Sequence, residues 1–401
     1  MPFFLTSCTS ESPDAVERAD EEADAPVEPC DLFAAEFVEI TSFDNSVDVS
    51  VGGSIVSPPH WERSREADFQ GAPGTTSLVP AAIPTKAGSK ATMNVKIEVT
   101  AADGLSGTGT LRGALGGVVW EGTFPVSVGI HSVTVETASA TTDLAAHRGD
   151  IAWVAAAPGC SAKPLATTRV ELYRIVEATA PAYLSAGRPV EALRFLYGAM
   201  SIGGEDAATA TGVKQTTTKI TRYLHTSHGL TYDTVRGAPS YIRSNRFNLT
   251  GYISRSGGNT VNCYDQASGV QVFSGILGIT CTKVYVEPFG FITSTTLVGG
   301  IVTNSPFFSA VGTGPTVPQF DAQRTYFGNH EFVEDAAGDV FDACSGPSVG
   351  TLDYNAYLNA SVDTALAVAA PPEPWHPPQI AWSQVWRRTV DDPRFRVRRL
   401  S

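Results

Sequence analysis

The chain has 401 residues, 42% of them hydrophobic, and a formal net charge of −13 at pH 7. A single core rarely extends beyond about 250–300 residues, so this length predicts two domains with terminal tails. The 41 acidic and 28 basic residues argue against nucleic acid as a general partner, because binding phosphates requires basic patches. No apolar run reaches the roughly 20 residues that span a bilayer, and no transmembrane span is expected.

Residues 1–34 are rich in Asp and Glu and poor in apolar residues, which predicts a disordered acidic leader. Within it, Leu5-Thr6-Ser7-Cys8 resembles the end of a bacterial lipoprotein signal, although the basic and apolar regions that normally precede it are missing. A lipid anchor at Cys8 and an extracytoplasmic location are therefore expected, and a chance match is the alternative.

Residues 35–178 alternate apolar and polar side chains with a period of two, which places the apolar ones on one face of a strand. The clearest runs are Val47–Val51, Val95–Val99, Val133–Val135 and Val170–Leu172. Turn clusters separate these runs, and no helical pattern intervenes. We predict an immunoglobulin-like β-sandwich that serves in binding or as a spacer.

Helical periodicity begins after this region. Pro189 suits the first turn of a helix, and Leu193, Leu196, Tyr197 and Met200 follow at helical spacing. A second helix is predicted over residues 207–226, and a third begins near Cys263. Strands return after Gly278. Helices followed by an antiparallel sheet predict an α+β domain over residues 179–370.

Cys263 is the first candidate for chemistry, because the sequence around it places the thiol in the first turn of the third helix. A thiol attacks carbonyl carbons as the thiolate, and the N-terminal end of a helix carries about half a positive charge that favours it. Asp265, in the same turn, competes for that positive end.

His330 and Asp342 lie on two predicted strands. The turn cluster at residues 335–339 joins these strands, so the two strands are expected to form a hairpin. On one face of this hairpin, Asp342 would accept the proton on Nδ1 of His330 and leave the other ring nitrogen toward Cys263. A thiol, a histidine base and a carboxylate that orients the base are the components of a nucleophilic acyl-transfer site.

The order Cys263, His330 and Asp342, with the cysteine opening a helix and the other two on successive strands, resembles the transglutaminase-like superfamily. That family shares its catalytic apparatus with papain-type cysteine peptidases, and the resemblance covers residues 181–370. It implies that these three residues are catalytic and that peptides or proteins are the substrates. No cofactor is predicted, and dependence on calcium is left open.

The chain departs from the family near the nucleophile. Asn262 precedes the cysteine, and no tryptophan occurs between Trp153 and Trp375. The backbone N–H of Cys263 is the default donor to an oxyanion, and a second donor is unassigned.

Two functions follow as hypotheses. The first is a cysteine-dependent enzyme that forms a thioester from an amide and passes the acyl group to water or to an amine, with hydrolysis slightly favoured. The second is a non-catalytic surface module that binds a partner through its β-sandwich and carries an inactive scaffold.

Other features are secondary. Cys30, Cys160, Cys281 and Cys344 allow three disulfide pairings, including a bridge between Cys281 and Cys344. His225 and His228 lack a third metal ligand, so a surface or helix-end role is expected for them. The Pro/Trp/Arg-rich tail, residues 371–401, is predicted to lie on the chain's own surface or, alternatively, to dock on a partner.

Overall fold

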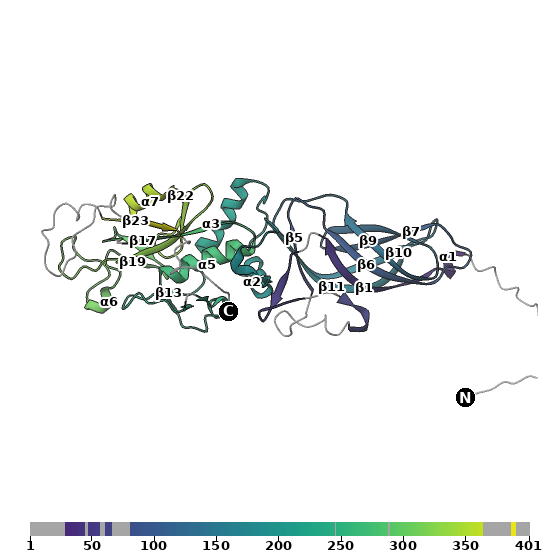
Figure 1. Ribbon diagram of the computed structural model, residues 1–401, viewed down its shortest axis with the longest axis horizontal. Coiled ribbons are helices and arrows are strands. Elements are labelled where there is room, and N and C mark those ends of the chain that lie inside the picture. The colour runs from purple at the N-terminus through teal and green to yellow at the C-terminus, as the bar shows by residue number, and fades with distance from the viewer. Residues whose placement is uncertain are drawn as a thin grey trace, which may run out of the picture.

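The computed structural model places the chain in two lobes side by side, a β-rich N-terminal lobe and a mixed C-terminal lobe (Figure 1). It describes residues 29–44, 47–56, 61–65, 81–244, 246–287, 289–363 and 386–389. Cys8, with its predicted lipid anchor, and most of the acidic leader and of the tail lie outside these ranges. None of the described helices is long and apolar enough to cross a membrane.

The N-terminal lobe is a nine-stranded sheet in the order β4-β1-β6-β9-β8-β7-β10-β11-β5. Neighbouring strands are antiparallel except β11 and β5, which run parallel. The strands are β1 (Ala34–Asp44), β4 (Trp61–Glu62), β5 (Ala81–Lys86), β6 (Thr92–Ala101), β7 (Thr108–Leu115), β8 (Val118–Pro125), β9 (Gly129–Thr137), β10 (Ala145–Ala156) and β11 (Lys163–Ile175).

The predicted alternation is confirmed where it is clearest. In β6, Met93, Val95, Ile97 and Val99 are fully buried, and the residues between them are partly exposed. These side chains line a core that also contains three buried tryptophans.

The expected two-sheet immunoglobulin arrangement differs from what is observed, because hydrogen bonds run without a break from β4 to β5 and the sheet curls (Figure 1). Strand twist accumulates across a wide sheet, and irregular pairing increases the bend. Register shifts occur in β1 near Phe37 and Ile40 and in β10 after Ala152. The single sheet thereby encloses its own apolar face.

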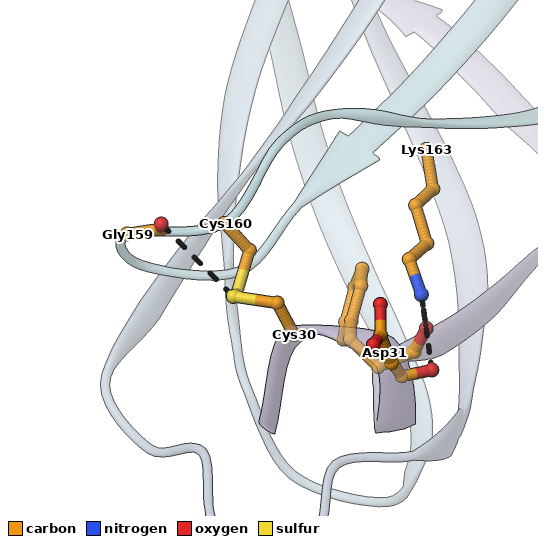
Figure 2. Close-up of a disulfide and its surroundings, with 6 residues drawn as sticks. Cys30, Asp31, Gly159, Cys160 and Lys163 are labelled. Atoms are coloured by element: carbon orange, nitrogen blue, oxygen red, sulfur yellow. Dashed lines mark hydrogen bonds between the residues drawn. A yellow bond between two sulfur atoms is a disulfide. The ribbon is translucent and has the colours of Figure 1, made fainter. Parts of the chain in front are cut away.

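A disulfide between Cys30 and Cys160 ties the start of the described chain to the far end of this lobe (Figure 2). Cys30 lies in α1 (Pro29–Leu32), and Lys163 reinforces the junction by donating to the backbone oxygen of Phe33 at 2.7 Å. The bridge considered between Cys281 and Cys344 does not form, and both thiols are free and buried.

Removing this disulfide is expected to lower the free energy of unfolding of the N-terminal lobe by about 2–4 kcal/mol, because the bridge closes a long loop of the unfolded chain. Its cysteines are 130 residues apart. The Cys30→Ser/Cys160→Ser double variant should melt earlier than the wild type by circular dichroism. Equal melting of the two proteins would contradict a stabilising role for the bridge.

The C-terminal lobe packs helices against a five-stranded sheet in the order β22-β21-β20-β17-β23. Its main helices are α2 (Val190–Tyr197), α3 (Ala210–Thr226), α4 (Leu249–Ser254) and α5 (Cys263–Ile276), and the strands are β17 (Thr282–Glu287), β20 (His330–Glu334), β21 (Asp339–Asp342), β22 (Ser348–Asp353) and β23 (Trp386–Thr389). The α+β architecture and all three predicted helices are therefore observed. The first ends at Tyr197, earlier than its apolar pattern extends.

Helix α5 is the central element of this lobe. Every residue of it except Tyr264 is buried, because it lies between α3 and the sheet. The core of this lobe continues into the end of β11, where Tyr173 and Ile175 pack in the same cluster as Leu193 of α2. A residue at the first turn of α5 is consequently held rigidly on two sides.

Shorter elements connect these helices and strands. They are β2 (Val49–Val51), β3 (Ser54–Ile55), η2 (Ala182–Leu184), β12 (Arg188–Pro189), β13 (Thr231–Tyr232), β14 (Ile242–Arg243), β15 (Arg246–Phe247), β16 (Thr260–Val261), β18 (Thr295–Leu297), β19 (Ile301–Thr303), α6 (Phe308–Val311) and α7 (Tyr354–Ser361).

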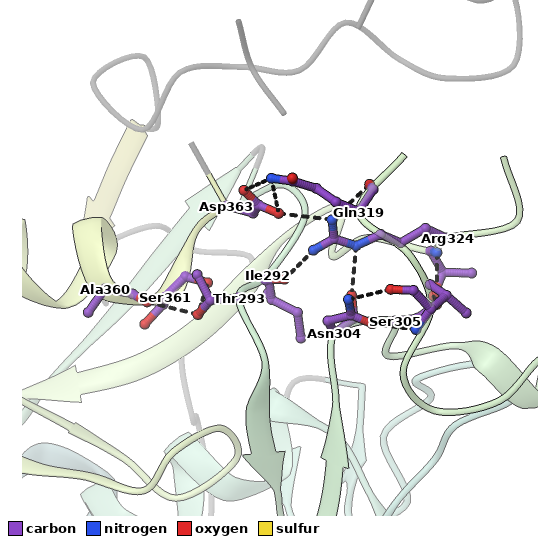
Figure 3. A network of polar contacts seen from close by, with 11 residues as sticks. Ile292, Thr293, Asn304, Ser305, Gln319, Arg324, Ala360, Ser361 and Asp363 are labelled. Carbon is purple, nitrogen blue, oxygen red and sulfur yellow. Dashed lines mark hydrogen bonds and ion pairs between the residues drawn. The ribbon is translucent and has the colours of Figure 1, made fainter. Parts of the chain in front are cut away.

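The long segment between β17 and β20 is fixed by Arg324, whose side chain is almost fully buried. The guanidinium donates to the backbone oxygens of Ile292, Asn304 and Gln319 and pairs with the carboxylate of Asp363 at 2.9 Å (Figure 3). One side chain thus joins four separate parts of the chain, so this segment has a defined shape next to the sheet.

The described part of the tail, β23, pairs antiparallel with β17 as the edge strand of the sheet. This part lies on the chain's own surface, as one of the two predictions for the tail proposed. The proline-rich stretch at residues 371–378 is outside the described residues.

Candidate active site

Cys263 is the first residue of α5, as the sequence predicts. Asn262 caps the helix: its side-chain oxygen accepts from the backbone N–H groups of Tyr264 at 3.0 Å and Asp265 at 3.2 Å. Asp265 completes a capping box by accepting from the N–H of Asn262. The N–H of Cys263 itself has no acceptor in the described part of the chain, so it is available to a ligand.

Asp265 does more than cap the helix. Its carboxylate accepts from the backbone N–H groups of Ser240 at 2.8 Å and Tyr241 at 3.0 Å, and so holds that loop against the start of α5. Burial raises the pKa of Asp265 to about 6, although these donors oppose the rise. The negative charge of Asp265, which the sequence predicts to compete with the thiol for the helix terminus, therefore faces these two backbone N–H groups as well.

His330 and Asp342 lie on adjacent strands of the sheet, both buried, with Nε2 of the imidazole 2.8 Å from Oδ2 of the carboxylate. The predicted hairpin is confirmed, since β20 and β21 pair with Val333 opposite Phe341. The predicted ring nitrogen is wrong. Asp342 is opposite Phe332, two residues from His330, and the ring presents its distal nitrogen, Nε2, to the carboxylate.

The orientation of the imidazole is fixed by aromatic neighbours. The ring of Phe327 stacks on it with a centroid distance of 5.1 Å, and that of Phe289 lies at 4.8 Å. With Nε2 directed at Asp342, the proximal Nδ1 is the atom left for a thiol. It is buried and has no hydrogen-bond partner within the described ranges.

His330 is not the only partner of the Asp342 carboxylate. Its Oδ2 also accepts from the hydroxyl of Tyr357 at 2.6 Å, and its Oδ1 accepts from the backbone N–H groups of Cys344 at 2.7 Å and Ser345 at 3.2 Å. Burial opposes its charge, yet the imidazole and these donors lower the pKa of Asp342 below its ordinary value. A fixed anion therefore faces His330.

The thiol of Cys263 lies close enough to His330 to affect its titration. Burial alone lowers the pKa of His330, but the Asp342 carboxylate and then the Cys263 thiol raise it to about 10. The structure thus brings the three predicted residues together from α5, β20 and β21. The imidazole favours its protonated form, which stabilises a neighbouring thiolate.

The two other free thiols differ from Cys263. Burial raises the pKa of Cys281 to about 12. Burial, followed by the Asp342 carboxylate and the Cys263 thiol, raises the pKa of Cys344 well above its ordinary value. Both stay protonated at neutral pH, so neither is suited to nucleophilic attack.

Tyr357 was not foreseen from the sequence. It lies in α7, 15 residues after the carboxylate that it contacts, and a tyrosine in a short helix carries no local signal of that contact. Gln266 was missed for the same reason. Its amide donates to the backbone oxygens of Leu224 and Ala343, and it thereby links the end of α3 to the residue after Asp342.

His225 and His228 are buried, contrary to the expected surface position. Their ring nitrogens bond to backbone oxygens, Nδ1 of His225 to Ala343 at 3.0 Å and Nε2 of His228 to Tyr252 at 2.8 Å. His225 does lie in the last turn of α3. No group of three metal-ligating side chains occurs in the described part of the chain.

Comparison with known proteins gives little further information. No family model and no curated protein matches the sequence. Among solved structures, the transglutaminase of red sea bream is similar, with 10% sequence identity and a TM-score of 0.35. The similarity covers 65% of this chain and 48% of the fish protein, so the chain spans about half of that relative. The assignment of function below therefore depends on the site itself.

Proposed function

We propose that the protein is a cysteine-dependent acyl-transfer enzyme in which Cys263 is the nucleophile, His330 the general acid and base, and Asp342 the group that orients the imidazole. One observation supports it most. A buried histidine is hydrogen-bonded to a fixed carboxylate through Nε2, and its unpaired Nδ1 is left for a thiol at the first turn of a helix.

Each residue has a defined task in this reaction. The thiolate of Cys263 attacks the carbonyl carbon of an amide, and the imidazolium of His330 gives its Nδ1 proton to the departing amine. A thioester remains. Nδ1 then takes a proton from water or from an acceptor amine, which attacks the thioester, and Cys263 leaves as the thiolate.

The proposed substrates are amide bonds of peptides or proteins, with hydrolysis favoured over amine transfer because an amine acceptor needs a second organised site. The segment fixed by Arg324 contains Phe307, and the centroid of this ring lies 6.2 Å from that of Tyr232. We propose that this segment governs the entry of water. An extracytoplasmic location is proposed with it, since disulfides persist in oxidising compartments.

Acylation by p-nitrophenyl acetate tests the proposal without knowledge of the natural substrate. The wild-type protein should release p-nitrophenolate in a burst and carry one acetyl group on the peptide that contains Cys263, as read by mass spectrometry. A folded protein that is never acylated at Cys263 would favour the second hypothesis, a non-catalytic binding module.

A further inference from the structure

Tyr232 is placed next to the nucleophile by a pair of short strands. It ends β13, which runs parallel to β16, and it stands opposite Val261, two residues before Cys263. The pairing continues one residue further, where the N–H of Asp233 donates to the backbone oxygen of Val261 at 3.0 Å. The tyrosine therefore enters the lobe where α5 begins.

The ring of Tyr232 belongs to the aromatic cluster that surrounds the imidazole. It meets Phe327 edge to face at 5.9 Å, and Phe327 in turn stacks on His330 at 5.1 Å. Phe307 contacts both of these rings, at 6.2 Å from Tyr232 and 5.9 Å from Phe327. The side chain thus has a fixed direction, with a single phenylalanine ring between it and His330.

The hydroxyl of Tyr232 lies over the loop that meets the helix cap. A Cβ atom built on Gly237 would come within 3.1 Å of this hydroxyl, and the backbone oxygen of Gly237 accepts from the side-chain amide of Asn262 at 2.8 Å. Asn262 is the residue before Cys263. The hydroxyl and the cap residue Asn262 thus contact the same residue of this loop, Gly237.

This hydroxyl has no hydrogen-bond partner among the described residues, although Tyr232 is only 4% exposed. The oxygen is not one of the fully buried unpaired atoms of the described residues, so a ligand can reach it. Burial, followed by the thiols of Cys344 and Cys263, keeps the pKa of Tyr232 well above its ordinary value. The phenol remains protonated and can donate.

We propose that the Tyr232 hydroxyl is the second oxyanion donor of the site, which the sequence leaves unassigned. The inference rests on the proposed function. Two donors would then converge on one oxygen, the N–H of Cys263 from the helix terminus and the O–H of Tyr232 from β13.

The donor acts in a single step. The sulfur of Cys263 forms a bond to the carbonyl carbon, and the π electrons of the C=O bond move onto oxygen. Tyr232 and the Cys263 N–H stabilise that negative charge by hydrogen bonds, and neither gives up its proton. When the intermediate collapses, the electrons return to re-form C=O and the bond to the leaving group breaks.

The Tyr232→Phe variant tests this role because it removes only the hydroxyl. Its acylation by p-nitrophenyl acetate should be slower by on the order of 10²-fold, the usual effect of losing one oxyanion donor, with little change in KM. Alkylation of Cys263 by iodoacetamide forms no oxyanion, so its rate should stay within about twofold of the wild type. A matched control is Tyr197→Phe, which removes the hydroxyl of a tyrosine on α2 that bonds to the backbone of Arg174.

Three outcomes would overturn the inference. Equal acylation of the wild type and Tyr232→Phe would exclude the donor role and leave the proposed function intact. A parallel loss of acylation and of alkylation would assign Tyr232 to positioning the thiol. A wild-type protein that is alkylated at Cys263 but never acylated would overturn the inference together with the proposed function.

Discussion

Replacing Cys263 with alanine is expected to abolish acyl-enzyme formation and to lower turnover by several orders of magnitude. Neither of the other two free thiols among the described residues can take its place, because Cys281 and Cys344 are buried and burial raises the pKa of both. The measurement is the burst of p-nitrophenolate, with mass spectrometry of the intact protein to detect the acetyl group.

Cys281→Ala is the matched control for this variant. It also removes a buried free thiol, but one that lies after the far end of α5. At a temperature where the variant is folded, it should still release p-nitrophenolate in a burst and carry the acetyl group on Cys263. Turnover in Cys263→Ala equal to that of the wild type would count decisively against the mechanism.

Replacing Asp342 with asparagine is expected to lower the rate of acylation by about 10⁴-fold while the fold is kept. The asparagine oxygen can still accept from the backbone N–H groups of Cys344 and Ser345. Its amide nitrogen, however, would face Nε2 of His330 as a donor. The imidazole would then carry its proton on Nδ1 and could not act as a base toward Cys263.

Tyr357→Phe provides the comparison for Asp342→Asn. It removes one hydrogen bond to the same carboxylate and leaves the tautomer of His330 unchanged. A hydrogen bond to a charged group contributes about 1.5–3 kcal/mol, so a fall of roughly ten- to a hundredfold is the largest effect expected. If acylation fell less in Asp342→Asn than in Tyr357→Phe, the contact between His330 and Asp342 would not set the tautomer of the imidazole.

The sequence predicts the parts of this site that local patterns encode. The apolar helical repeat that follows Cys263 predicts where α5 begins, and the turn at residues 335–339 predicts the hairpin that carries His330 and Asp342. Periodicity of two likewise predicts β6. Each of these signals lies within a dozen or so residues of the feature that it determines.

Contacts between distant segments could not be predicted in this way. Whether Nδ1 or Nε2 of His330 faces Asp342 depends on the rings of Phe289 and Phe327. Tyr357 reaches the carboxylate from a helix that begins after β22. The curling of the nine-stranded sheet depends on its summed twist, and alternating side chains alone do not distinguish it from two stacked sheets.

The pH dependence of Cys263 alkylation follows from the charge on His330. The pKa of this imidazole is raised to about 10, so it is protonated at neutral pH and loses its charge only as the pH rises through that value. The pKa of Asp342 is lowered, so the carboxylate stays charged until strongly acid pH. Between these limits, the imidazolium and the helix terminus both favour the thiolate.

The most direct test is the rate of iodoacetamide alkylation at Cys263, mapped by peptide mass spectrometry between pH 6 and pH 8, in the wild type and in His330→Ala. An ordinary thiol reacts roughly tenfold faster for each pH unit in this range, because its thiolate fraction rises in proportion. We predict rapid and nearly constant alkylation in the wild type and the steep rise in His330→Ala. The same steep profile in both proteins would contradict a charge-coupled Cys263 and His330.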